Sequence, residues 1–262
     1  MILDRIVETK KEEVAQSKKN VGLADLQEAA KGLPACRDFK AAISGKPCAI
    51  IAEVKCASPS RGRLVENLDP LQIAGLYEEN GAAAISVLTD EKYFAGQKIY
   101  LTQIRQKVKL PLLRKDFIID PYQIYETRVM GADAVLLIAA VLGNNLGKFI
   151  AVAKVLGLHQ LVEIHTRAEL DLALAAGAEI IGINNRDLDT FVVDIDTCKE
   201  LRRFIGADKI VVAESGINCR ADIAAMIRTG INAFLIGEAL VTASDIGKKL
   251  REFRGERENG AD

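Results

Sequence analysis

Charged residues follow apolar strands at several points of this sequence, and the first of these points is the stretch Pro47 to Gly62, PCAIIAEVKCASPSRG. The apolar residues Ala49 to Ala52 predict a buried strand, and Glu53 and Lys55 come at its end. Residues two apart on a strand point to the same face, so a carboxylate and an ammonium group leave this strand side by side. Contact with solvent would explain one such strand, but the same layout returns later in the chain.

Three later strands are expected to end in the same way. Lys115 lies in the run PLLRKD, Glu163 in QLVEIH and Glu214 in IVVAES, while another strand contributes Asn184 and Arg186. If one sheet brings these strand ends together, two lysines and three carboxylates surround one cavity with an Asn and an Arg.

Such a ring of charges suits general acid and base catalysis without a usable histidine. A carboxylate beside ammonium groups stays ionised, whereas a crowded lysine loses part of its preference for the charged form. The alternative is a set of ion pairs that only plug the cavity. That alternative is disfavoured because burying so many charges without a ligand is costly.

A repeated pattern of strand, loop and helix begins at Pro47 and must position these residues. A glycine precedes an apolar strand at four similar junctions, GAAAISVLT at Gly81, GADAVLLIA at Gly131, GAEIIGINN at Gly177 and GINAFLIGE at Gly230. The four strands that follow these junctions and the four strands that end in charged residues make eight strands, which alternate with helices. Their apolar runs are typical of parallel strands buried on both faces. The pattern predicts a (β/α)8 TIM barrel, with an open doubly wound sheet as the alternative.

Residues 1–44 are expected to form a helical extension that packs on the barrel, so that residues 1–262 make a single barrel domain. Apolar residues at helical spacing predict one helix near the start of the chain, and a second piece follows at residues 23–30. The first barrel helix is expected to start at Asp69-Pro70, an N-cap followed by proline at the first helical position.

Two glycine turns indicate a phosphate site. Ser215-Gly216 follows the seventh barrel strand and Gly237-Glu238 follows the eighth. Glycine lets backbone N–H groups approach an anion, and loops after strands seven and eight are the recurrent phosphate position of this fold. Lys55 or Arg61 is expected to supply the counter-charge.

Composition excludes several other classes of protein. The chain of 262 residues has a net charge of −1, interspersed charges and no tryptophan, so no nucleic-acid partner is expected. Its apolar runs are shorter than a membrane span, and its charged N-terminus does not resemble a secretory signal, so a cytoplasmic protein is expected. Five scattered cysteines, and histidines only at His159 and His165, predict neither a disulfide framework nor a metal site.

Seven runs in order from Ile51 to Leu240 closely resemble the indole-3-glycerol-phosphate synthase family: IAEVKCASPSRG, SVLTDEKYFAGQ, LLRKDFIIDPYQIYE, LVEIHTRAEL, IGINNRDL, VAESGI and FLIGEAL. The N-terminal ILDRIVETKKEEV also fits the helical extension of that family. The resemblance implies ring closure, decarboxylation and dehydration of 1-(2-carboxyphenylamino)-1-deoxyribulose 5-phosphate in tryptophan biosynthesis, without a cofactor. The expected partner is this phosphorylated, anthranilate-derived substrate, and the expected assembly is a monomer or weak homodimer.

The resemblance also implies roles for individual residues. Lys115 would be the general acid at the ketone oxygen, and Glu163 would transfer a proton during loss of the hydroxyl. Lys55 would lie by the substrate carboxylate or phosphate, while Glu53 and Asn184 would orient the reacting groups. The substrate-binding residues would be Ser58, Phe94, Phe117, Leu136, Arg186, Leu188, Glu214, Ser215, Gly216, Gly237 and Glu238, of which Phe94, Phe117, Leu136 and Leu188 would surround the aromatic ring.

Two other functions remain as alternatives. A barrel similar to phosphoribosylanthranilate isomerase would bind a related phosphate, but it should lack both the N-terminal extension and a second lysine at the mouth. A non-catalytic barrel scaffold would be expected to lose some of the charged residues. Cys56 departs from the family pattern, and alternation turns it away from Lys55. The short charged end of the chain leaves no room for a second barrel, which indicates a stand-alone enzyme.

Overall fold

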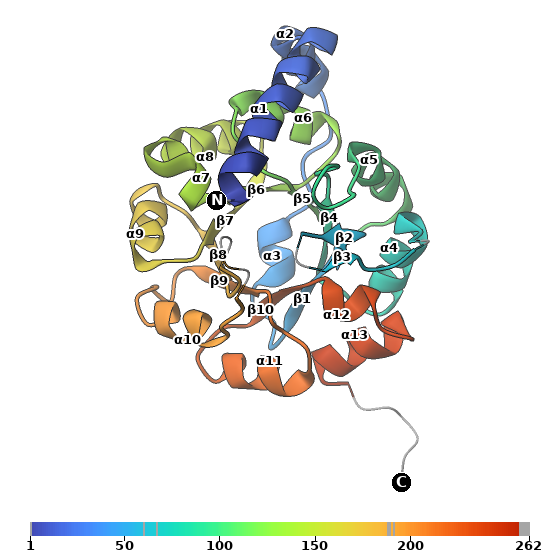
Figure 1. The fold of residues 1–262 in the computed structure, drawn as a ribbon, viewed down its shortest axis with the longest axis vertical. Coiled ribbons are helices and arrows are strands. Elements are labelled where there is room, and N and C mark those ends of the chain that lie inside the picture. Colours follow the sequence, from blue (N-terminus) through green and yellow to red (C-terminus); the bar gives the residue numbers. More distant parts are fainter. Residues whose placement is uncertain (1, 60, 67, 188–189, 191, 257–262) are drawn as a thin grey trace.

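Eight parallel strands close into a barrel in the computed structural model, which describes residues 1–262 except 1, 60, 67, 188–189, 191 and 257–262 (Figure 1). The barrel strands are β1 (Ala49–Val54), β4 (Ala84–Leu88), β5 (Leu112–Lys115), β6 (Ala134–Ile138), β7 (His159–Ile164), β8 (Ile180–Asn184), β9 (Ile210–Glu214) and β10 (Ala233–Ile236). β1 pairs with both β4 and β10, so the sheet has no free edge. The predicted (β/α)8 barrel is confirmed, and the open doubly wound sheet is excluded.

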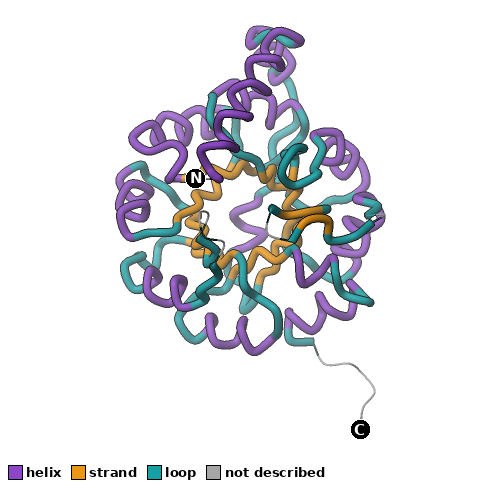
Figure 2. Tube along the Cα trace, in the orientation of Figure 1, coloured by secondary structure: helices purple, strands orange, loops and turns teal. Residues whose placement is uncertain are grey.

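Helices surround the barrel on its outer side (Figures 1 and 2). They are α4 (Pro70–Glu79), α5 (Lys98–Lys107), α6 (Pro121–Val129), α7 (Ala139–Leu142), α8 (Leu146–Val155), α9 (Arg167–Ala175), α10 (Asp196–Arg202), α11 (Arg220–Ile227), α12 (Glu238–Val241) and α13 (Ile246–Arg254), with a 3-10 turn η1 (Gly143–Asn145) before α8. The expected start of α4 is confirmed. The Asp69 carboxylate accepts the N–H groups of Leu71 and Gln72, and Pro70 takes the first helical position.

The alternation of side chains places an apolar layer beneath the charged residues. Ile51, Leu113, Leu161 and Val212 pack together inside the barrel. Each of them lies two residues before one of the charged residues at the strand ends, so the charges face inward one layer higher. The inward orientation expected for these charged side chains is confirmed.

Three helices precede the barrel, namely α1 (Ile2–Asn20), α2 (Leu23–Ala30) and α3 (Phe39–Ile43). The helix expected near the start of the chain and the one at residues 23–30 are both confirmed. α3 was not expected, because five residues are too few to show a helical period. Its buried Phe39 and Ile43 pack with Ala49 and Ile51 against the barrel interior, opposite to the mouth. α3 is visible inside the ring of strands (Figure 1).

A small hairpin follows β1 and was also not expected. β2 (Ala57–Ser58) and β3 (Gly62–Arg63) pair antiparallel beside the mouth (Figure 1). β1 itself ends at Val54, so Lys55 is the first residue of the connecting loop. None of the described helices combines the length and the apolar composition of a membrane-spanning segment.

Candidate active site

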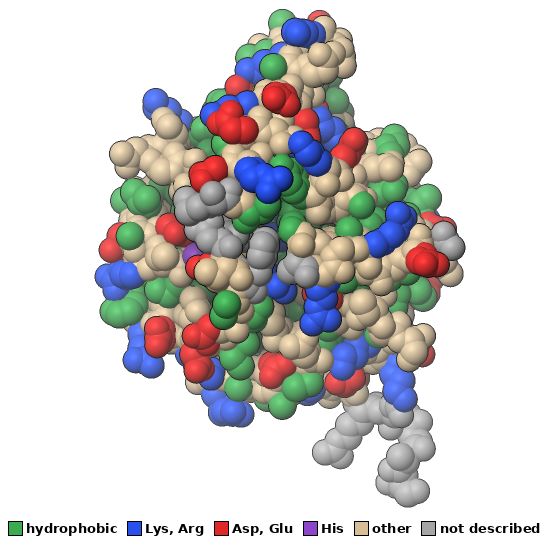
Figure 3. All heavy atoms as spheres, in the orientation of Figure 1, with side chains coloured by type: hydrophobic (Ala, Val, Ile, Leu, Met, Phe, Trp, Pro, Cys, Tyr) green, Lys and Arg blue, Asp and Glu red, His purple; other side chains and the backbone are tan. Residues whose placement is uncertain are grey.

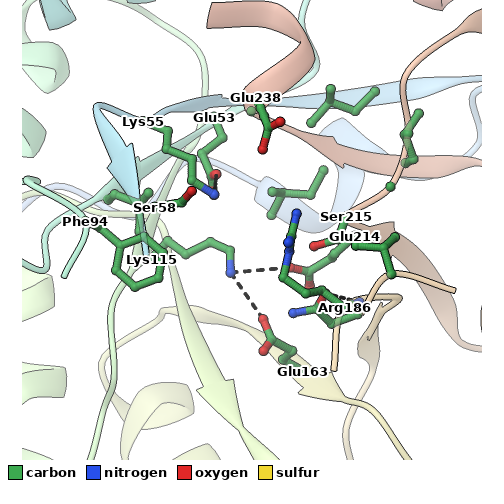
Figure 4. A pocket seen from close by; sticks show the side chains of 18 of the residues that line it. Glu53, Lys55, Ser58, Phe94, Lys115, Glu163, Arg186, Glu214, Ser215 and Glu238 are labelled. Carbon is green, nitrogen blue, oxygen red and sulfur yellow. Dashed lines mark hydrogen bonds and ion pairs between the residues drawn. The ribbon is translucent and has the colours of Figure 1, made fainter. Parts of the chain in front are cut away.

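A cavity of about 530 Å³ opens at the C-terminal ends of the barrel strands (Figure 4). On the face that carries this mouth, acidic and basic side chains are interspersed over the surrounding helices and loops (Figure 3). All the expected site residues but one line the cavity: Glu53, Lys55, Ser58, Phe94, Lys115, Phe117, Leu136, Glu163, Asn184, Arg186, Glu214, Ser215, Gly216, Gly237 and Glu238. The remaining residue, Leu188, lies outside the described residues.

Lys115 is the centre of the charged ring. Its Nζ lies 3.2 Å from Glu163 Oε2 and 3.4 Å from Glu214 Oε2, and its side chain is only 16% exposed (Figure 4). Glu163 comes from β7 and Glu214 from β9, so three strands bring this group of charges together. Glu53 of β1 completes it through a longer electrostatic attraction to Lys115.

The pKa values in this ring correct one expectation. Burial alone would lower the pKa of Lys115, but attraction to Glu163, Glu214 and Glu53 outweighs burial and raises it. The expectation that a crowded lysine loses part of its preference for the charged form is therefore wrong for Lys115. The charged groups nearest to its Nζ are the carboxylates of Glu163 and Glu214, which stabilise the ammonium form.

The two nearest carboxylates differ in protonation. Burial raises the pKa of Glu163, but Lys115 and His165 more than offset this and hold that pKa below its usual value. Burial, together with repulsion from Glu163 and Glu53, raises the pKa of Glu214 to about 8 even though Lys115 opposes the change. At neutral pH the ring therefore contains an ammonium donor, an ionised acceptor and a carboxyl group that holds a proton.

A second cation lies next to an aromatic pocket. The Nζ of Lys55 is 3.6 Å from Glu53 Oε1 and 5.6 Å from the centre of the Phe94 ring. Phe94 and Phe117 have ring centroids 6.0 Å apart, and Leu136 lines the same cavity. An apolar wall with an ammonium group at its edge suits an aromatic ring that carries a carboxylate.

The glycine turns lie on the β9 and β10 side of the cavity. Ser215 has φ 64° and Gly216 φ 76°, so both residues adopt the left-handed conformation after β9. For Ser215 this is a strained conformation, of the kind that clusters at ligand sites. Arg61 Nε lies 3.0 Å from Glu238 Oε1, so the proposed counter-charge Arg61 contacts a carboxylate of the β10 turn.

Gly182 of β8 provides space that the charged ring needs. A Cβ atom at this position would collide with the Glu214 carboxylate and would lie 3.2 Å from Leu161 Cδ1. Gly182 pairs with Glu163 and Val212 on the two neighbouring strands, so it lies directly between the two strands that supply the carboxylates. This role of Gly182 was not predicted from the sequence.

We expect Gly182→Ala to reduce turnover by about tenfold or more, because its methyl group must push the Glu214 carboxylate away from Lys115. Gly147→Ala is the matched control, since a Cβ at Gly147 meets no atom within 4 Å. Steady-state kinetics of both variants measure the effect. Equal turnover in the two variants would contradict a spatial role for Gly182.

Sequence reasoning also missed residues that contact this ring. His165 was set aside together with His159, yet its Nε2 lies 3.6 Å from Glu163 Oε1. The signal was present, because Glu163 and His165 are two residues apart at a strand end. Ser86 of β4 was not identified either, and its hydroxyl donates to Glu53 Oε2 at 3.4 Å. Within the part of the chain that the structure describes, no three His, Cys, Asp or Glu side chains are arranged to hold a metal ion.

The chain resembles known proteins both in sequence and in fold. The chain is 48% identical over 256 residues to the indole-3-glycerol phosphate synthase of Alkaliphilus metalliredigens, which covers 97% of this chain and 98% of that protein. It is 50% identical over 254 residues to the synthase of Chlorobaculum tepidum, covering 96% and 98%. Among solved structures, the 3-hexulose-6-phosphate synthase of Salmonella typhimurium shares the fold with a TM-score of 0.65 at 15% identity, over 79% of this chain and 97% of that chain.

At 15% identity, the likeness to the solved structure shows only that the chain shares its barrel fold. The sequence relatives are closer and align with nearly the full length of the chain. The sequence model of indole-3-glycerol phosphate synthase matches residues 3–253, which include the N-terminal extension and all eight barrel strands. The chain therefore belongs to the indole-3-glycerol phosphate synthase family.

Proposed function

We propose that the charged ring carries out the reaction after which the family is named. The protein acts as a carboxy-lyase of tryptophan biosynthesis, which closes the indole ring of 1-(2-carboxyphenylamino)-1-deoxyribulose 5-phosphate and releases carbon dioxide and water. The observation that carries the proposal is the position of Lys115, a buried ammonium group between an ionised Glu163 and a protonated Glu214.

Ring closure requires an acid at the ketone oxygen. Lys115 donates a proton to that oxygen while the aromatic carbon that carries the carboxylate attacks the ketone carbon. Loss of carbon dioxide leaves its bonding electrons on the ring and restores the aromatic system. The former ketone oxygen, now a hydroxyl, takes a second proton from Lys115, which has regained one from solvent, and leaves as water. Glu163 accepts the proton from the neighbouring carbon, which completes the double bond of the indole.

The other residues bind and orient the substrate. Lys55 attracts the substrate carboxylate, and the pocket of Phe94, Phe117 and Leu136 holds the aromatic ring. Glu53 and Asn184 orient the reacting groups. The remaining members of the site are assigned to the hydroxylated chain and the phosphate, namely Ser58, Arg186, Glu214, Ser215, Gly216, Gly237 and Glu238. The protein is proposed to work as a monomer or weak homodimer, which sedimentation at several concentrations would test.

Mass spectrometry of the reaction mixture tests this function directly. The synthase reaction gives a product that is lighter than the substrate by one carbon dioxide and one water. An isomerase would give a product of unchanged mass, and a non-catalytic scaffold would give no product. Either of the last two results would overturn the proposal.

We expect Lys55→Ala to weaken substrate binding as well as turnover, because its ammonium group lies at the edge of the aromatic pocket. Loss of a charge-assisted contact of this kind costs about 1.5–3 kcal/mol. Calorimetry with a non-reactive analogue of the substrate that keeps its carboxylate measures the effect. Lys92→Ala serves as the control, since this exposed lysine also lies over an aromatic ring, that of Tyr93, but outside the cavity. Unchanged affinity in Lys55→Ala would remove the proposed contact.

A further inference from the structure

His165 lies next to Glu163 and is not among the residues that line the cavity. It directly follows β7, and its side chain is 11% exposed. Its Nε2 lies 3.6 Å from Glu163 Oε1, whereas Lys115 lies against the other oxygen, Oε2, at 3.2 Å. The two oxygens of this carboxylate therefore each face a different nitrogen group.

The imidazole ring is held from its other side by Glu169 in the first turn of α9. Glu169 Oε2 accepts the backbone N–H of His165 at 2.7 Å and lies 3.3 Å from Nδ1 of the ring. The Thr166 hydroxyl donates to Glu169 Oε1 at 3.1 Å, and Thr166 Oγ1 accepts the N–H of Glu169 as the helix cap. Glu169 is thus fixed by the start of the helix, and it fixes the orientation of the ring.

The second ring nitrogen, Nε2, faces the Glu163 carboxylate. His165 Nε2 is fully buried and has no hydrogen-bond partner within the described residues, so Glu163 is the polar group that it faces. Burial alone would lower the pKa of His165, but Glu169, Glu163 and Glu214 together raise it. Such an arrangement favours the doubly protonated ring, because its positive charge faces a carboxylate on each side.

We propose that His165 is a positioning residue, which holds the Glu163 carboxylate ionised and turned toward Lys115 through a chain from Glu169 to His165 to Glu163. The inference rests on the role proposed for Glu163 in proton transfer. His165 does not touch the substrate in this account, since it is not among the residues that line the cavity.

Imidazole NMR tests the contact without any use of activity. The chain has two histidines, so His159→Gln assigns the spectrum; His159 lies at the start of β7, 3.5 Å from Asp38, far from the mouth. We expect His165 to titrate at higher pH than a free histidine. We expect both Glu163→Gln and Glu169→Gln to lower its pKa, because each removes one of the facing charges. An unchanged His165 titration in Glu163→Gln would overturn the proposal.

Kinetics of two His165 variants test the consequence. His165→Asn can replace Nδ1 toward Glu169 but cannot reach Glu163, whereas His165→Gln can place an uncharged donor near Glu163. We expect His165→Asn to lower kcat by about tenfold with little change in KM, and His165→Gln to recover part of the loss. Equal kcat in wild type and His165→Asn would contradict the proposal.

The pH profile separates this role from the titration of Glu214, whose pKa is raised to about 8. The His165 cation is present below the pKa of His165 and is lost as the pH rises through that pKa. In the wild type, kcat should therefore fall over this pH range, which gives the profile a descending limb. In His165→Gln that limb should be absent, while the limb due to Glu214 should remain. A wild-type protein without synthase activity would refute the proposed function, but the NMR result would still decide the contact.

Discussion

Lys115→Ala is expected to lower turnover by about 10²- to 10⁴-fold, the range of a general acid, while the barrel still folds. The rate falls because no other ammonium group lies between Glu163 and Glu214 in the described part of the cavity. The fold should survive because a crowded carboxyl group can take up a proton instead, as the raised pKa of Glu214 already indicates. Circular dichroism and product binding establish that the variant is folded, and near-normal turnover would remove Lys115 from the mechanism.

Lys115→Arg is the informative companion of this variant. It keeps a positive charge among the three carboxylates, but a guanidinium does not give up its proton at neutral pH. We expect it to bind product better than Lys115→Ala and to remain nearly inactive. Substantial turnover in Lys115→Arg would indicate that the charge at this position matters and its proton does not.

Lys10→Met is expected to give the largest loss of stability, about 3–5 kcal/mol, the cost of breaking a buried ion pair on one side. Lys10 lies on α1 and is 3% exposed. Its Nζ is 3.0 Å from Asp90 Oδ2 and 2.9 Å from Asp116 Oδ1, and both carboxylates are fully buried. Asp116 follows Lys115 directly, so the N-terminal extension is joined to the end of β5. The variant is therefore expected to lose catalytic rate as well.

Lys11→Met is the matched control for this effect. The neighbouring Lys11 is 58% exposed and pairs with an exposed Glu8, so its loss should change stability by at most about 0.5 kcal/mol. Urea unfolding of both variants measures the difference. If the two were equally stable, the buried pairing would not hold the extension to the barrel.

The same buried charges give a prediction for acid pH. Burial would raise the pKa of Asp116, but Arg114 and Lys10 lower it to about 2. A carboxylate with a depressed pKa contributes stability above its unfolded value and loses that contribution as the pH falls through the folded value. The free energy of unfolding should therefore fall between about pH 4 and pH 2, and this fall should be smaller in Lys10→Met.

Much of the fold follows from local sequence patterns. The apolar strands, the glycine junctions and the start of α4 at Asp69-Pro70 each predicted an element that the structure contains. Period-two alternation also placed Lys115 and Glu163 on the inner face, because a regular strand fixes the direction of every second side chain. Short elements such as α3 were not predicted, since their few residues show no helical period.

Protonation could not be predicted from the same patterns. The sequence shows that lysines and carboxylates share the mouth, but the pKa of Lys115 depends on which group comes within 3–4 Å of its Nζ. The barrel register decides this, and so does the absence of a side chain at Gly182. Likewise, the contacts of Lys10 join residues about 80 and 106 positions away in the chain, which no local pattern reveals.

The most direct test of the account follows indole fluorescence after the purified protein is mixed with 1-(2-carboxyphenylamino)-1-deoxyribulose 5-phosphate, in buffer without added metal or cofactor. We expect a rise in the wild-type protein that is lost in Lys115→Ala, although this variant still binds the product. A wild-type protein that binds the substrate without any rise in fluorescence would contradict this expectation.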